Sequence, residues 1–153
     1  MVDTLSYEMI QIFFLSVFNP FKNAKDDSSK IDALIRLGSK FLDNDNKIAQ
    51  NYFQQAITLA TQADDQKRLG ITLFHFAQSQ SDEGKNEDAI TTVLKCIQIL
   101  DSIKATTYLA KAYRTIGQMK YAQGEYNAAL SYANKALSIF EEKANKYELA
   151  NTY

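Results

Sequence analysis

The chain has 153 residues, of which 46% are hydrophobic and 23% are charged, and its formal net charge at pH 7 is −1. That length is typical of one ordinary domain, and this hydrophobic fraction is enough for a continuous core. Basic and acidic residues are interspersed along the chain, without the basic stripe or patch that marks a nucleic-acid-binding surface. We therefore expect no nucleic-acid partner.

An apolar run over residues 9–18 lies near the beginning of the chain. It is too short to span a bilayer as a helix, which takes about 20 apolar residues, and acidic residues precede it where a signal peptide carries basic ones. We expect a helix over residues 4–18 that packs on protein. A degenerate export signal and a membrane-surface anchor are the alternatives, and the lack of basic residues argues against the anchor. The helical stripe of this segment consists of Ile10, Phe13, Phe14, Val17 and Phe18.

Residues 1–20 are thus assigned to an apolar N-terminal helix and residues 21–27 to a polar linker. A cytoplasmic location is favoured, with export as the alternative if the apolar run is a signal. The scarcity of proline and glycine indicates a nearly all-helical chain, because both residues disfavour helix interiors. The further helices are predicted near residues 28–42, 46–63, 66–82, 86–102, 106–122 and 126–143.

Three stretches of the chain fall into register when the sequence is shifted by 40 residues. A fixed period of this size is the signature of a helical repeat architecture. Gly84 and Gly124 coincide under this shift and lie where a first helix must stop, as a C-terminal glycine commonly does. The small residues within the helices mark where paired helices cross at short range. The residues that coincide are Ala49 with Ala89 and Ala129, and Ala56 with Cys96 and Ala136.

The third unit carries the most complete pattern, with Tyr113, Ile116-Gly117, Gly124, Tyr126, Ala129 and Ala136. This set resembles the tetratricopeptide repeat, in a 40-residue variant with longer helices than usual. The resemblance extends over residues 28–145, as three units of about 28–65, 66–105 and 106–145. In the first unit, Asn44 and Asp45 replace the turn glycine, and we expect its turn to be one residue shorter. Residues 146–153 align with the beginning of a unit and are predicted to start an incomplete fourth repeat.

The resemblance implies an all-α, right-handed superhelical stack whose concave face is lined by the first helix of each unit. It further implies a protein or peptide partner held on that face. Apolar side chains there would hold an apolar partner residue, and the two glutamines would bond a peptide backbone. Lys111 with Arg114 would engage a carboxylate, or else form an ordinary solvated face. The expected partner-binding residues are Ile35, Ser39, Ile71, Phe74, Gln78, Lys111, Arg114, Gln118 and Tyr121, with Asp32 beside them.

Residues with reactive or metal-binding side chains are few. His75 is the single histidine, and we expect it to pack or to lie on the surface. The acidic string over residues 43–46 lacks the glycine and the distal glutamate of a calcium loop, which indicates a solvated turn. Cys96 occupies a small-residue position of the repeat, so we expect a buried thiol. The sequence predicts no enzyme, with no catalytic residue, cofactor or metal site.

Two functions remain open at this point, beside a regulatory domain that controls an attached catalytic or DNA-binding domain. The first is a scaffold that binds proteins or peptides on its concave face, as part of a larger signalling or adaptor protein. The second is a structural module that oligomerises through its N-terminal helix or through the open C-terminal end of the stack. An exposed terminal core of a repeat stack promotes association, which is the reason for the second hypothesis.

Overall fold

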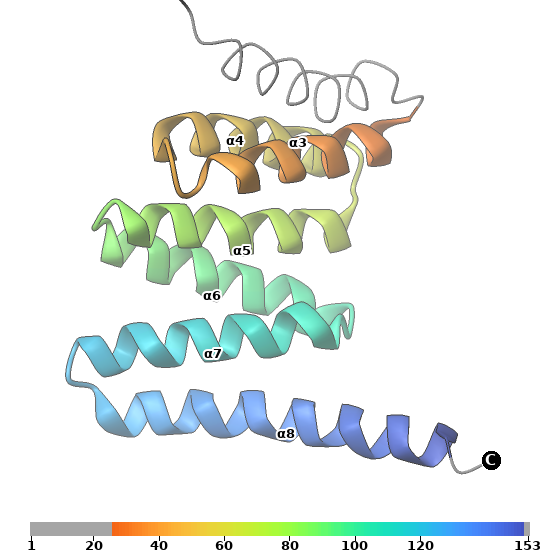
Figure 1. Ribbon diagram of the computed structural model, residues 1–153, viewed down its shortest axis with the longest axis vertical. Coiled ribbons are helices and arrows are strands. Elements are labelled where there is room, and N and C mark those ends of the chain that lie inside the picture. The colour runs from red at the N-terminus through yellow and green to blue at the C-terminus, as the bar shows by residue number, and fades with distance from the viewer. Residues whose placement is uncertain (1–25, 152–153) are drawn as a thin grey trace, which may run out of the picture.

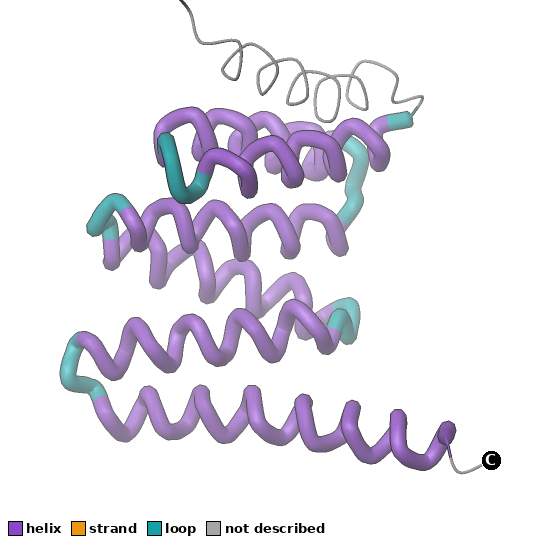
Figure 2. Tube along the Cα trace, viewed as in Figure 1, coloured by secondary structure: helices purple, strands orange, loops and turns teal. Residues whose placement is uncertain are grey.

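The computed structural model describes residues 26–151, and this part of the chain is a stack of α-helices joined by short turns (Figure 1, Figure 2). The predicted helix over residues 4–18, its apolar stripe and all but the end of the linker lie outside the described residues. The described helices are α3 (Asp27–Phe41), α4 (Asn46–Gln62), α5 (Gln66–Asp82), α6 (Asn86–Ser102), α7 (Thr106–Ala122) and α8 (Tyr126–Asn151).

The helices pack in consecutive pairs, α3 with α4, α5 with α6 and α7 with α8. Each pair then joins the next one, because α5 also packs on α4 and α7 also packs on α6. A single core runs through these contacts from Ile31 in α3 to Ile116 in α7. The expectation of an all-α repeat stack is therefore confirmed.

The helix ends follow from short polar side chains and glycines. The carboxylates of Asp26, Asp45 and Asp65 accept hydrogen bonds from backbone N–H groups in the first turns of α3, α4 and α5, which satisfies donors that have no partner within the helix. Gly84 and Gly124 both have φ +79 and follow α5 and α7. This left-handed conformation favours glycine, so the predicted glycine stops are confirmed.

The small residues of the repeat lie where helices approach closely. A Cβ atom at Gly38 would come within 2.5 Å of the Phe53 ring, and one at Gly70 would come equally close to Leu100. Ala89 and Cys96 have no exposed surface, and the Cys96 thiol donates a hydrogen bond to the Gly70 carbonyl oxygen at 3.2 Å. Burial raises the pKa of this thiol to about 12, so the predicted buried thiol is confirmed.

The first unit differs from the prediction in how it is shortened. Its first helix, α3, has 15 residues where α5 has 17, and residues 42–45 separate α3 from α4 where residues 83–85 separate α5 from α6. The turn is thus one residue longer and the helix two residues shorter, and the predicted shorter turn is wrong. A turn without glycine needs the extra residue to reverse the chain, because none of its residues adopts a left-handed conformation.

The last helix also departs from the prediction, because α8 continues to Asn151 instead of ending near residue 143. The earlier junctions between units turn at Asp64 and Lys104, whose φ values are 51 and 55. The corresponding residue 40 positions on is Ala144, and a left-handed alanine is unfavourable. No following helix among the described residues packs on α8 to offset that cost, so the helix continues. A fourth repeat over residues 146–153 stays a prediction.

Candidate functional site

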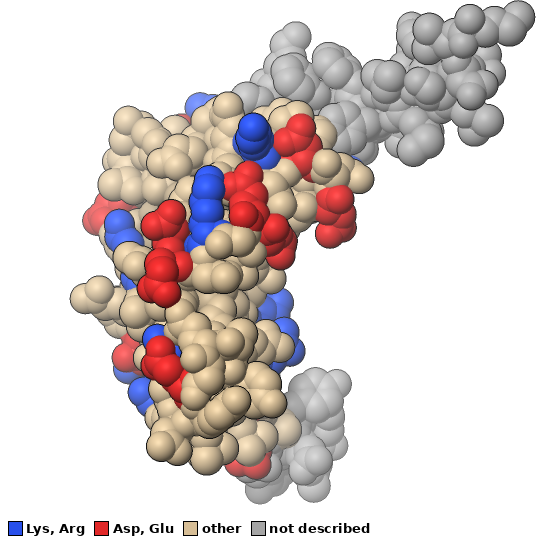
Figure 3. Space-filling view, turned by 90° about the vertical axis from the view of Figure 1, so that its left-hand side faces the viewer, with Lys and Arg blue, Asp and Glu red and all other residues tan. Residues whose placement is uncertain are grey.

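The face lined by α3, α5 and α7 is the hollow side of the stack. These three helices lie in front of α4 and α6 in Figure 1, and the side view shows the surface curving inward on the side that they occupy (Figure 3). Acidic and basic side chains lie side by side on the flank of the stack that faces the viewer in Figure 3. The side chains of this hollow face are the first place to look for a binding site, because concave surfaces bury more of a ligand.

A groove of about 500 Å³ crosses this side of the stack near the turns that end α3 and α5. Two of the predicted binding residues, Gln78 and Gln118, occupy equivalent positions of α5 and α7 and both line it. We call it the polar groove, because carboxylates, amides and hydroxyls supply most of its lining side chains. The polar groove is lined by Leu42, Asp43, Gln78, Ser81, Asp82, Asn86, Ile90, Thr115, Gln118, Met119, Ala122 and Gln123.

An aromatic cluster joins α4, α5 and α7 in the interior. The His75 ring stacks on Phe53 at 5.9 Å between centroids and meets Phe74 and Tyr108 edge-on at 5.3 and 6.0 Å. Burial lowers the pKa of His75 below its usual 6.5, a Gln78 hydrogen bond opposes this shift, and the positive charge of Lys111 adds to it. His75 is therefore neutral near pH 7, and its predicted packing role is confirmed.

The cationic residues predicted for this face lie in different surroundings. The Lys111 ammonium lies 4.7 Å from the centre of the Tyr108 ring, where the ring face attracts a cation. Arg114 is exposed and lines a second cavity, between α7 and α8. The side chain of Asp32 is held by Arg68, with nitrogen–oxygen distances of 2.8 Å at both carboxylate oxygens.

Two of the three apolar residues predicted for the binding surface are buried, and the third is half-buried. Ile35 is 9% exposed and Phe74 is 5% exposed, and both belong to the core. Ile71 is half-buried against the same core, and Ser39 is half-buried in α3. Ile35 and Phe74 occupy the repeat position of Arg114, so an apolar side chain at this position turns inward while the long arginine extends to solvent.

The cavity between α7 and α8 has a volume of about 400 Å³ and is mainly apolar. Tyr121 lies at its edge, with its ring 5.3 Å from that of Tyr126. The structure thus brings three predicted binding residues into one cavity beside the polar groove, on the last pair of helices. They are Arg114, Gln118 and Tyr121. We call this cavity the apolar groove, and its lining residues are Arg114, Gly117, Gln118, Tyr121, Tyr126, Ala129, Leu130 and Ala133.

The polar groove contains side chains that the repeat pattern did not identify. Asp82 and Asn86 flank the glycine turn between α5 and α6, and Gln123 precedes the next glycine. Their position beside Gly84 and Gly124 could have identified them, because the equivalent turns of successive repeats lie on the same side of the stack. Asp43 was assigned to a solvated turn, and it is exposed in the turn after α3 while also lining the groove.

The described residues contain no cluster of three or more side chains that could hold a metal ion. Nor is any described helix long and apolar enough to cross a membrane. The binding properties of the hollow face depend on its shape and on its exposed side chains. Within residues 26–151 the face combines amides and carboxylates near the turns, an aromatic interior, and two cations toward the beginning of α7.

The sequence model of the tetratricopeptide repeat matches residues 72–142. Among curated proteins, response regulator aspartate phosphatase J of Bacillus subtilis (strain 168) is 28% identical over 95 residues, which are 61% of this chain. The chain spans only about a quarter of that relative, since the match covers 26% of it. The relative is therefore a much longer protein than the part that is compared.

Solved structures share the fold. Aspartyl phosphate phosphatase F from Bacillus subtilis superimposes with a TM-score of 0.79 at 21% identity, over 91% of this chain and 37% of its own. A Rap protein complexed with competence and sporulation factor gives 0.74 at 24% identity, over 89% and 41%. The tetratricopeptide repeat domain of Arabidopsis FLU gives 0.69 at 19% identity, over 76% and 99%.

Proposed function

Because the chain belongs, through residues 72–142, to the tetratricopeptide repeat family, we propose that it binds an extended peptide segment of a protein partner across its hollow face. The polar groove holds the segment, and binding involves no covalent step. In this account the chain is the recognition segment of a larger signalling or adaptor protein. A Rap protein of similar fold was solved in complex with competence and sporulation factor, which supports a ligand of this kind.

The observation that carries the proposal is the pair of glutamines in the polar groove. Gln78 and Gln118 lie at equivalent positions of α5 and α7 and line the same cavity. A side-chain amide both donates and accepts hydrogen bonds, as a peptide group does. Two amides on one wall match the alternating N–H and C=O groups of an extended chain, which remain unpaired until something binds them.

The charges along the hollow face give the segment a direction. Asp43 and Asp82 line the polar groove near the turns, and they attract a basic side chain or a free amino group. Lys111 and Arg114 lie further back along α7 and attract a carboxylate, which arginine can bind through two parallel hydrogen bonds. The preferred segment therefore carries a basic group toward the turns and an acidic group toward the beginning of α7.

The test uses random heptapeptides selected for binding to the immobilised full-length chain. The dissociation constant of each selected, fluorescently labelled peptide is then measured by polarisation. We expect Gln78→Ala with Gln118→Ala to weaken binding at least about tenfold, because each lost hydrogen bond is worth about 1 kcal/mol. Gln98→Ala is the matched control, since this glutamine is exposed on α6 outside the polar groove.

Three results would contradict the proposal. One is that no heptapeptide binds more tightly than a scrambled version of itself. Another is that the double variant binds as tightly as the unaltered chain while its helical circular dichroism is also unaltered. Equal losses in the double variant and in Gln98→Ala would likewise place the contact outside the polar groove.

A further inference from the structure

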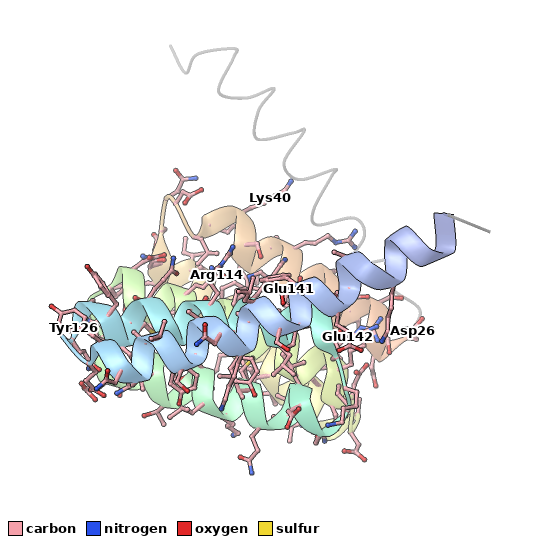
Figure 4. The ribbon with its side chains drawn as sticks, turned by 90° about the horizontal axis from the view of Figure 1, so that it is seen from below. Asp26, Lys40, Arg114, Tyr126, Glu141 and Glu142 are labelled. Atoms are coloured by element: carbon pink, nitrogen blue, oxygen red, sulfur yellow. The ribbon has the colours of Figure 1, made fainter. Side chains whose placement is uncertain are left out.

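The outward face of α8 carries large apolar side chains that remain largely exposed within the described residues. Tyr126 is 64% exposed, Leu130 62%, Leu137 53% and Phe140 41%. Seen from below, α8 lies in front of the other helices along its length, with Tyr126 near one end (Figure 4). A contiguous face of this kind usually marks an interaction site, whereas isolated apolar residues do not.

The second unit shows what normally lies on this face. Forty residues before Leu130 and Phe140 are Ile90 and Leu100 of α6, which are 7% and 0% exposed. The helix that packs on α6 from the following unit is α7. Leu100 also lies against Gly70 of α5, so α6 is covered from both sides, whereas among the described residues α8 packs only on α7. The bare face of α8 therefore fits a further helix.

The exposed apolar residues of α8 up to Ala144 are spaced alternately by four and by three. This spacing places them in one seam along the helix, as in helices that pair lengthwise. The seam reaches Ala144, whereas the residue 40 positions earlier, Lys104, already lies in a turn with φ 55. The seam therefore continues past the position where the contact between two units ends, and it follows α8 from Tyr126 to Ala144. The seam residues are Tyr126, Leu130, Ala133, Leu137, Phe140 and Ala144.

We propose that the occupant is α8 of a second copy of this chain, packed antiparallel across a two-fold axis near residue 135. In that register Ala133 faces Leu137 of the other copy, and the axis repeats the contact with the copies exchanged. Tyr126 in the same way faces Ala144, and Leu130 faces Phe140. A small residue thus packs against a large one in the outermost pair, Tyr126 with Ala144, and in the innermost pair, Ala133 with Leu137. Such pairs fill the space between facing helices without voids.

A parallel pairing lacks this complementarity. It would place each residue against its own copy, so that Ala133 faces Ala133 and Phe140 faces Phe140. Two alanines leave a gap and two phenylalanines crowd the next layer, and both errors destabilise a packed interface. The antiparallel arrangement also buries Leu130 and Ala133, two of the residues that line the apolar groove from α8.

The first experiment measures the mass of the full-length chain in solution by light scattering and its dimer dissociation constant by sedimentation equilibrium. We expect a dimer, and Leu137→Glu should raise the dissociation constant at least about 100-fold, since two charges would be buried per dimer. Leu94→Glu is the matched control, because Leu94 is a 44% exposed leucine of α6 outside the seam. Circular dichroism of each variant separates loss of pairing from loss of folding.

The second experiment tests the register with single cysteines. Chains with Ala133→Cys are mixed with chains with Leu137→Cys and oxidised, and we expect the mixed disulfide to form faster than either like pair. The native Cys96 has no exposed surface, so it does not compete.

Four results would overturn the proposal. They are a monomer at micromolar concentration, a dimer that Leu137→Glu leaves intact, an equal loss of the dimer in Leu94→Glu, and like pairs forming faster than the mixed pair. A variant in the N-terminal apolar run, Phe14→Glu, completes the comparison. Loss of the dimer in Phe14→Glu, with retention in Leu137→Glu, would assign the contact to that run instead of the seam. Peptide binding is measured separately, so either result leaves the proposed function to its own test.

Discussion

The helices α6 and α8 occupy the same place in successive units and differ in what covers them. In α6, Val93 and Leu100 have no exposed surface, because α6 lies between α5 and α7, with Leu100 against Gly70 of α5. In α8 the corresponding residues are Ala133 and Phe140, and both are accessible, Phe140 to 41%. The comparison teaches that the repeat pattern determines which face of a helix is apolar, while the neighbouring element determines whether that face is buried.

The largest predicted difference between the two helices concerns their stability. Leu100→Ala should lower the free energy of unfolding by about 3 kcal/mol, because it opens a cavity in a fully buried site. Phe140→Ala should cost about 1 kcal/mol at protein concentrations below the dimer dissociation constant, since much of the ring is already in water. Urea denaturation measures both, and equal losses would show that the faces of α6 and α8 are covered alike.

A smaller difference is expected at the glycines beneath these helices. A Cβ at Gly70 would lie 2.5 Å from Leu100 Cδ2, whereas a Cβ at Gly117 would lie 3.3 Å from the Ala129 carbonyl oxygen. Gly70→Ala should therefore destabilise the chain by about 2 kcal/mol. Gly117→Ala should change stability by less than about 1 kcal/mol, because α8 has room to move outward and alanine favours the helix.

The double variant Gly70→Ala with Leu100→Ala provides the control for this prediction. The smaller side chain at position 100 relieves the overlap. The loss of unfolding free energy in the double variant should therefore be smaller than the sum of the two single losses. Strict additivity in urea denaturation would show that the Leu100 side chain is not what excludes a Cβ at Gly70.

The smallest expected effect is a pH dependence from His75 in the covered part of the stack. Burial holds the pKa of His75 below 6.5 in the folded state, so the unfolded chain takes up the proton first as the pH falls. The stabilising contribution is present above pH 6.5 and is lost below it, by about 1 kcal/mol or less. His75→Gln should flatten the stability profile between pH 7.5 and 5.5, and thermal denaturation across that range measures it. An unchanged slope would show that His75 titrates alike in both states.

Much of the fold could be predicted from the spacing of small residues and glycines. These residues act locally, since Gly84 and Gly124 terminate helices whatever lies nearby and Ala89 must fit beneath a neighbouring helix. The extension of α8 could not be predicted, because the turn at Lys104 depends on packing of the next helix and not on a residue that prefers a left-handed conformation.

The candidate site could be predicted less well than the fold. The repeat register correctly brings Gln78 and Gln118 into one groove, but it treats Ile35, Phe74 and Arg114 as equivalent. Whether a side chain at that position turns inward depends on its polarity and length, and on the space left between neighbouring units. The carboxylates of the polar groove were missed because they lie in and beside turns, where the repeat pattern constrains only the glycine.

The most direct test of peptide binding on the hollow face is an NMR titration of the full-length chain with a selected heptapeptide. The account predicts that the side-chain amide signals of Gln78 and Gln118 shift together with backbone signals in the second halves of α5 and α7, while Gln98 on α6 remains unchanged. Shifts confined to Gln98 and its neighbours on α6, or to the seam of α8, would contradict the account.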